Sequence, residues 1–176
     1  MINQQVNVAS LSLRMAVSIA LAGWMAGSAI AQDAKKAAVF DLELIDTSLE
    51  GEIRGKNAAE SQRLRMASDR LRRELVGTGA YVLVDQTPAA DAVKAAGFLH
   101  GCNGCEADIA RALGAEIAVT GTVQKVSNLI LNINVYVTDV ATQKRIAAAS
   151  VDIRGNTDES WARGVSYLVR NRLAGN

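Results

Sequence analysis

The stretch Leu129-Ile130-Leu131-Asn132-Ile133-Asn134-Val135-Tyr136-Val137-Thr138 decides the fold. Its apolar and polar side chains alternate, which is the period-two pattern of a β-strand. The apolar set consists of Leu129, Leu131, Ile133, Val135 and Val137, and the polar set of Asn132, Asn134, Tyr136 and Thr138. The pattern predicts an antiparallel strand with one face on a core and the other face open to water.

Two more strands flank this stretch in the chain. Residues 117–123 are rich in β-branched side chains, and a turn at Ser127-Asn128 separates them from the central strand. A second turn, at Val140–Gln143, leads to a further strand from Arg145 to Ile153. The three strands are consecutive, so we expect an antiparallel meander.

The rest of the chain alternates between strand and helix patterns. Strands are predicted at 37–44 and, as a buried strand, at 81–85; helices at 59–76, 89–96, 105–113 and over the last segment. Asn156 and Glu159 have the spacing of a capping box for the last helix, which carries Trp161 on its apolar stripe. We therefore predict an α/β (α+β) fold of order β-α-β-α-β-β-β-α, with the helices on one face of a mixed sheet.

Residues 1–31 have the features of a secretory signal peptide. Arg14 is their only charge, an apolar run follows from Met15, and Ser28-Ala29-Ile30-Ala31 supplies the small residues of a cleavage site. The alternative is a membrane anchor, but 17 residues from Met15 to Ala31 fall short of the roughly 20 needed to cross a bilayer. We expect a single domain, 32–176, in the periplasm, with no membrane span in the mature form.

The charge balance argues against nucleic acid as a partner. The chain has 19 basic and 18 acidic side chains, and removal of the signal removes Arg14, so the mature form is formally neutral. Proteins that bind nucleic acid usually carry a basic excess. Five arginines between residues 63 and 73 are interspersed with acids, and we interpret them as a solvated helix face. No motif indicates a cofactor.

The only cysteines, Cys102 and Cys105, are separated by two residues. In an exported protein the default is a structural disulfide. A redox-active pair is the sharper alternative, because a helix N-terminus lowers the pKa of a nearby thiol. A metal site would add His100 and Glu106 to the two thiolates, which is cramped. Covalent haem attachment requires a histidine where Glu106 stands.

Other motifs are weaker. The segment Gly51–Asn57 resembles a phosphate loop, but it is one residue short between its glycines and has Asn57 where a Ser or Thr should bind magnesium. We interpret it as a flexible charged loop. No nucleophile motif accompanies His100, the only histidine. The chain is therefore more consistent with a binding protein than with an enzyme.

Candidate partner-binding residues lie on the open sheet face and in the loop that follows it. On the face they are Asn132, Asn134 and Tyr136, and in the segment from 152 to 158 they are Asp152, Arg154, Asn156 and Asp158. A solvated face explains the same pattern, so both interpretations stay open at this point.

Three strings give the chain a family resemblance: Cys102-Asn103-Gly104-Cys105-Glu106, the segment 123–132, and the segment 152–161. They resemble a family of small secreted proteobacterial proteins of unknown function. More distantly, Asp85, Leu113-Gly114-Ala115 and Gly121-Thr122-Val123 fit a layout similar to the amino-terminal domain of TolB and the periplasmic domain of CsgG. That likeness implies a role in envelope assemblies through protein contact.

The sequence thus predicts an exported periplasmic accessory protein that binds another envelope protein without catalysis. The alternative is a thiol-disulfide or electron-transfer accessory acting through Cys102 and Cys105.

Overall fold

The computed structural model describes residues 33–173. The predicted signal segment lies outside these residues, so its cleavage and the domain boundary at residue 32 stay predictions. None of the helices within 33–173 is long and apolar enough to cross a membrane.

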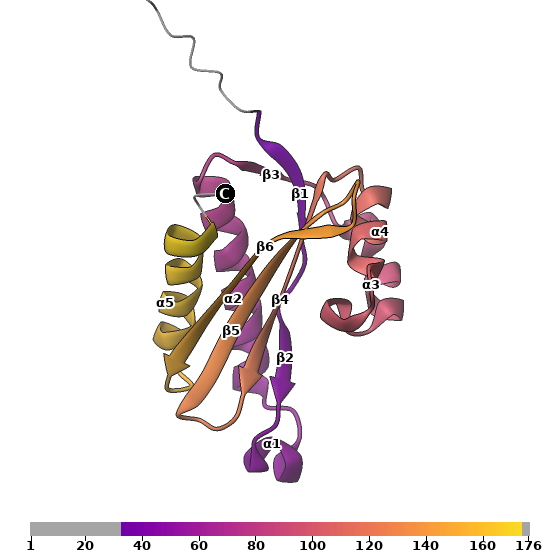
Figure 1. The fold of residues 1–176 in the computed structure, drawn as a ribbon. Helices are drawn as coiled ribbons and strands as arrows, with labels where there is room; N and C mark the ends of the chain where they lie inside the picture. Colours follow the sequence, from indigo (N-terminus) through magenta and orange to yellow (C-terminus); the bar gives the residue numbers. More distant parts are fainter. Residues whose placement is uncertain (1–32, 174–176) are drawn as a thin grey trace, which may run out of the picture. The chain divides into compact units, whose positions relative to one another are not determined.

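A six-stranded mixed sheet organises the chain (Figure 1). The strands are β1 (Lys35–Val39), β2 (Glu43–Asp46), β3 (Tyr81–Leu83), β4 (Ile117–Lys125), β5 (Ile130–Asp139) and β6 (Lys144–Arg154). Their order is β3-β1-β4-β5-β6, and β2 pairs with β4 beyond the end of β1. The pairs among β1, β2, β3 and β4 are parallel, whereas β4, β5 and β6 form the predicted antiparallel meander.

The helices connect these strands. They are α1 (Leu49–Arg54), α2 (Ala58–Gly77), α3 (Ala90–Ala96), α4 (Cys105–Ala112) and α5 (Asp158–Leu168), with short 3-10 turns at Thr87–Ala89 and Leu99–Gly101 and a π turn at Val169–Leu173. The predicted α+β class with a mixed sheet is confirmed. Compared with the predicted order, the observed chain has one more strand, β2, and two more helices, because α1 is new and two helices, α3 and α4, stand where the order has one.

The extra strand arises because the predicted strand 37–44 is interrupted. After β1 the chain leaves the sheet ladder, and the Leu42 N–H donates to Ser68 Oγ of α2 at 2.9 Å. The Leu42 side chain fills the space over Gly121, where an added Cβ would lie 2.6 Å from Leu42 Cδ2. The glycine in β4 therefore accommodates the detour. The segment Gly51–Asn57, interpreted as a flexible loop, begins inside α1, which is capped by Ser48.

The helices differ from the expected placement, because they cover both faces of the sheet (Figure 1). One core packs α2 and α5 on the first face, and a second core packs α3 and α4 on the other. In β1, Ala37 and Val39 belong to the first core and Ala38 to the second, all fully buried. Continuous apolar runs are typical of strands covered on both sides.

The one-sided pattern holds for β5. Leu131, Ile133, Val135 and Val137 are buried on the face of α2 and α5, while Asn132, Asn134 and Tyr136 are half-buried on the other. Thr138, expected on the open face, is buried. The strand predicted as buried, β3, is a short edge strand, which leaves Val82 52% exposed.

Side chains of α2 and α5 correct two local predictions. Arg63 pairs with Asp158 at 2.8 Å, Arg70 donates to Ser166 Oγ at 2.7 Å, and Arg72 donates to the Val39 carbonyl at 3.0 Å. Three of the five arginines therefore make tertiary contacts, whereas Arg65 and Arg73 are exposed as expected. The helix cap of α5 is Thr157 rather than Asn156. Trp161 is fully buried in the core, as predicted.

Candidate functional site

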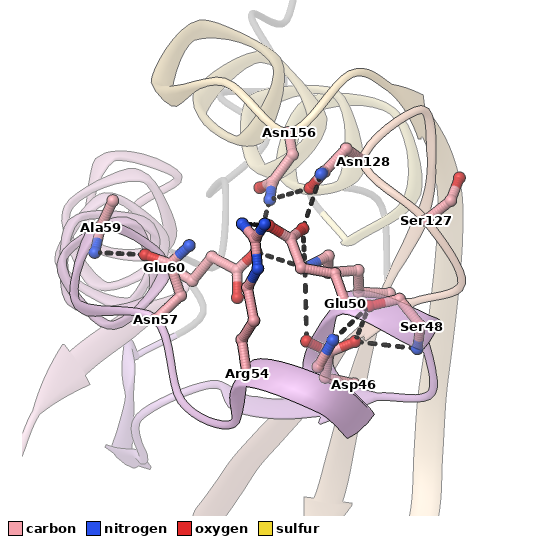
Figure 2. Close-up of polar contacts among 12 residues, drawn as sticks. Asp46, Ser48, Glu50, Arg54, Asn57, Ala59, Glu60, Ser127, Asn128 and Asn156 are labelled. Carbon is pink, nitrogen blue, oxygen red and sulfur yellow. Dashed lines mark hydrogen bonds and ion pairs between the residues drawn. The ribbon is translucent and has the colours of Figure 1, made fainter.

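A buried ion cluster lies where β4 ends. The Lys125 ammonium is 2.6 Å from Glu60 Oε1, 3.3 Å from Asp46 Oδ2 and 3.4 Å from Glu50 Oε2. The Lys125 and Glu60 side chains are each only 1% exposed. Figure 2 shows the three acids converging from separate elements: Asp46 from the end of β2, Glu50 from α1 and Glu60 from the first turn of α2.

Sequence reasoning missed this cluster, although a signal for it was present. Lys125 continues the inward alternation of Val119 and Val123 along β4. Glu60 stands four residues before Leu64, on the same stripe of α2 that buries Ala67. One cation and one anion, each at an apolar position of its own element, predict a buried pair, because ionised side chains are rarely buried singly.

Two asparagines extend the cluster to neighbouring loops. Asn156 Nδ2 donates to Glu60 Oε1 at 2.6 Å, and Asn156 Oδ1 accepts from Trp161 Nε1 at 3.0 Å. Asn128 Nδ2 donates to Glu50 Oε2 at 2.7 Å, and its own Oδ1 accepts from Asn156 at 3.0 Å (Figure 2). The polar network thus joins α1, α2, the β4–β5 turn and the β6–α5 turn.

The charges in the cluster stabilise one another. Burial, the largest single influence, would raise the pKa of Asp46, but hydrogen bonds from Ser48 and the Lys125 ammonium outweigh it and hold that pKa below its ordinary value. Burial would likewise lower the pKa of Lys125, whereas Glu60 and Asp46 outweigh it and raise that pKa. The amide of Asn128, followed by Lys125, lowers the pKa of Glu50. The protonated Lys125 is therefore a structural cation and a poor nucleophile.

Apolar side chains are exposed next to this cluster. Leu49 and Ile53 lie on α1, and Val126, Leu129 and Ile130 lie on or beside the β4–β5 turn; their exposed fractions range from 48% to 73%. The two segments are adjacent because the Thr47 N–H donates to the Lys125 carbonyl at 2.9 Å and Asn128 bonds to Glu50. We call these five residues the apolar end.

The predicted open-face residues are brought together. Asn132 Nδ2 donates to Asp152 Oδ1 at 2.8 Å, Asn134 Nδ2 to Thr122 Oγ1 at 3.4 Å, and the Arg145 guanidinium lies 4.0 Å from the centre of the Tyr136 ring. Arg154 is exposed and pairs in register with Ile130 at the end of the same face.

The remaining two predicted partner-binding residues, Asn156 and Asp158, do not lie on the sheet face. The Asn156 side chain belongs to the ion cluster, and Asp158, at the first turn of α5, pairs with Arg63 of α2. The structure therefore separates the predicted set into a sheet face and a pair of residues on the helical side.

Cys102 and Cys105 form a disulfide with a Cα–Cα distance of 5.6 Å. It connects the Leu99–Gly101 turn to the first residue of α4, and the intervening Asn103 and Gly104 both have positive φ. The Glu106 carboxylate lies 3.6 Å from Cys102 Sγ.

His100 belongs to a different group. Its backbone N–H and that of Leu99 donate to the Glu43 carboxylate at 3.1 Å and 2.7 Å, and its Nδ1 lies 3.8 Å from Glu43 Oε2. Within residues 33–173 the one group of three or more acids, cysteines and histidines close enough to share a metal ion is Cys102, Cys105 and Glu106. His100 is not part of it, and the disulfide occupies both thiols.

Several solved structures are similar to this chain at low sequence identity. The C-terminal domain of LpoB from Salmonella enterica is 17% identical with a TM-score of 0.51, over 69% of this chain and 84% of that domain. Lipoprotein GNA1162 from Neisseria meningitidis is 12% identical with a TM-score of 0.47, over 82% and 99%. TolB from Acinetobacter baumannii is 13% identical with a TM-score of 0.42, over 80% of this chain and 29% of TolB. The expected likeness to TolB is thus found, and the likeness to CsgG stays a prediction.

Comparison with curated protein sequences finds no match. A family model, DUF3280, described as "Protein of unknown function (DUF2380)", matches residues 35–173. This match confirms the expected membership in a family of unknown function, whereas secretion stays a prediction. The chain belongs to the DUF3280 family.

Proposed function

We propose that this chain is an exported accessory protein that binds another envelope protein and catalyses no reaction. The observation that carries the proposal is the apolar end, five large aliphatic side chains exposed together on two adjacent segments. Clustered exposed apolar side chains are typical of interaction sites, whereas single ones need no explanation.

The hydrogen bonds and ion pairs beneath the apolar end indicate that this surface is already ordered before a partner binds. Glu50 of α1 and Asn128 of the turn bond to each other, and both are connected to the buried Lys125–Glu60 pair. Apolar side chains held on ordered backbone lose little conformational entropy when a partner binds, which improves affinity. This arrangement supports a binding role.

The polar sheet face continues the proposed surface. Ile130 stands in register with Arg154, and the next pair on the same side of the two strands is Asn132 with Asp152. Asn134 and Tyr136 follow along β5. Interfaces combine an apolar centre with a polar rim rich in hydrogen-bonding groups and tyrosine. We propose the apolar end as the centre and this face as the rim, with Asn156 and Asp158 supporting it from the helical side.

The alternative proposal, a thiol-disulfide or electron-transfer accessory, is less well supported. The Glu106 carboxylate beside Cys102 would oppose formation of a thiolate there, whereas reactive cysteines need an electropositive environment. Both sulfur-bearing residues are half-buried against the second core. A structural disulfide that fixes the turn before α4 accounts for both observations.

Site-specific photo-crosslinking in living cells tests the binding proposal. A photoreactive amino acid at Ile53 or at Leu129 should form an adduct with the same envelope protein. Val82, an exposed aliphatic residue on the edge strand β3 with 52% of its surface accessible, is the control and should form none. Equal adducts at all three positions, or none at Ile53 and Leu129, would contradict the proposal.

Two further measurements separate the proposal from its alternatives. Osmotic-shock fractionation should recover the processed chain in the periplasm; recovery of an unprocessed chain in the cytoplasm would refute export. The double variant Cys102→Ser/Cys105→Ser should keep the crosslinks from Leu129 with a lower stability. Loss of function in a folded double variant would instead support the redox alternative.

A further inference from the structure

We propose that a cavity beside the ion cluster binds an alkyl chain that ends in a guanidinium or ammonium group. The cavity has a volume of about 510 Å³ and lies among β2, the start of α2 and the turn after α3. Ligand-binding cavities commonly measure roughly 300–1,000 Å³. A neighbouring cavity of about 230 Å³ shares Asp46, Asn57 and Glu60 with it. This proposal is independent of the apolar end.

A buried carboxylate faces this cavity with one oxygen free. The Glu60 side chain is 1% exposed, and its Oε1 accepts hydrogen bonds from Lys125 and from Asn156, each at 2.6 Å. Within residues 33–173, both hydrogen bonds to this carboxylate end on Oε1, and none is donated to Oε2. Glu60 lines both cavities, so Oε2 is available to a donor that enters them.

The charge around the cavities favours a cation. Their lining contains four acidic side chains, Glu43, Asp46, Glu50 and Glu60, against three basic ones, Arg54, Lys56 and Lys125. Arg54 and Lys56 are exposed, whereas Glu60 is buried, so the acids dominate the interior. An additional cation would reduce this excess of negative charge, whereas an anion would be repelled.

An organic cation fits better than a metal ion. The Lys125 ammonium already stands among Asp46, Glu50 and Glu60, and in the part of the chain that the structure describes these carboxylates are not close enough to share a metal ion. A guanidinium or ammonium group needs hydrogen-bond acceptors rather than a coordination shell, and a carboxylate oxygen supplies a charge-assisted bond.

The apolar wall accounts for the alkyl chain. Leu44 and Leu64 line the cavity as half-buried side chains, and Phe98, 50% exposed, stands at its margin. Lysine and arginine side chains bury their methylene stems on apolar surface of this kind, and a guanidinium is attracted to an aromatic face. The same chemistry could come from a small free cation or from a basic side chain of a bound protein.

Amide NMR titration of the purified protein tests this site. n-Butylguanidinium should shift the amides of Leu44, Ser61 and Phe98 in a saturable way, and uncharged 1-butanol should not. Phe98→Ala should weaken the binding roughly two- to five-fold, as expected for loss of an exposed cation–π contact. Val82→Ala, a change at a similarly exposed residue that does not line the cavity, should leave the binding unchanged. Glu60→Gln should abolish binding. If the Glu60→Gln variant does not fold, Phe98→Ala still tests the site.

A second ligand distinguishes the two sources. N-acetyl-arginine N-methylamide presents the same group on a peptide backbone. Binding of this compound would support a basic side chain of a protein as the occupant, and binding of butylguanidinium alone would support a small free cation. Equal shifts with 1-butanol, or no saturable shift with either cation, would overturn the proposal.

Discussion

Replacing Lys125 with Met keeps the length of the buried side chain but removes its charge. The Glu60 carboxylate, 1% exposed and 2.6 Å from the lost ammonium, would then retain Asn156 as its hydrogen-bond donor and have no counter-ion in contact. Breaking a buried ion pair by removing one partner costs about 3–5 kcal/mol. We therefore expect Lys125→Met to lower the free energy of unfolding by about that amount, a large part of the roughly 5–15 kcal/mol typical of a domain.

Removing the charge of the acidic partner, Glu60, should cost less stability than removing that of Lys125. In Glu60→Gln, Lys125 keeps Asp46 at 3.3 Å and Glu50 at 3.4 Å, and the amide can still accept a hydrogen bond. We expect a loss of about 1–3 kcal/mol for this variant. In the double variant no buried carboxylate is left uncompensated at position 60, so its loss should be smaller than the sum of the two single losses by about 0.5–3 kcal/mol.

Urea unfolding followed by far-ultraviolet circular dichroism measures these differences. Arg163→Met is the matched control, because the Arg163–Glu159 pair has a similar N–O distance, 2.8 Å, but both side chains are at least 70% exposed. Exposed pairs contribute roughly 0–1 kcal/mol. The reasoning would be refuted if Lys125→Met cost no more than Arg163→Met, or if the single losses added without coupling.

Three other perturbations follow from the same structure. The pKa of Asp46 lies below its ordinary 3.8, because hydrogen bonds from Ser48 and the Lys125 ammonium outweigh burial. The stabilising contribution of Asp46 is therefore present above about pH 4 and is lost as the pH falls through the lowered folded-state pKa. In pH-dependent urea unfolding, Asp46→Asn should lose less stability than the native chain below about pH 4, and identical acid profiles would contradict this. Cys102→Ser/Cys105→Ser should lower the free energy of unfolding by about 2 kcal/mol, since the disulfide closes a short loop, and a reduced native chain should behave like the double variant. Gly164→Ala should lower stability by about 1–3 kcal/mol despite the better helix propensity of alanine, because the added Cβ would lie 2.7 Å from Ile153 Cγ2 and 2.9 Å from Ile133 Cδ1; a stabilised variant would show that this contact relaxes freely.

Local patterns determined a large part of the fold. The alternation from Leu131 to Val137 predicted the central strand of the meander and its buried face, and the spacing of apolar residues predicted α2 and α5 with Trp161 in the core. These predictions succeed because side-chain direction follows directly from the period of a single element. The sequence could name the partners of a disulfide, the default for an exported chain, because the chain has only two cysteines.

Contacts between elements that are distant in sequence decided the rest. The detour at Leu42 depends on the space over Gly121, and the second core depends on where α3 and α4 pack; neither is encoded within one element. The ion cluster assembles Lys125 with Glu60 from 65 residues earlier in the chain and with Asn156 from the turn before α5. Sequence periodicity marks Lys125 and Glu60 as inward-facing, but only the folded chain brings their charges within 2.6 Å of each other, since charge pairing depends on distance and burial rather than on order along the chain.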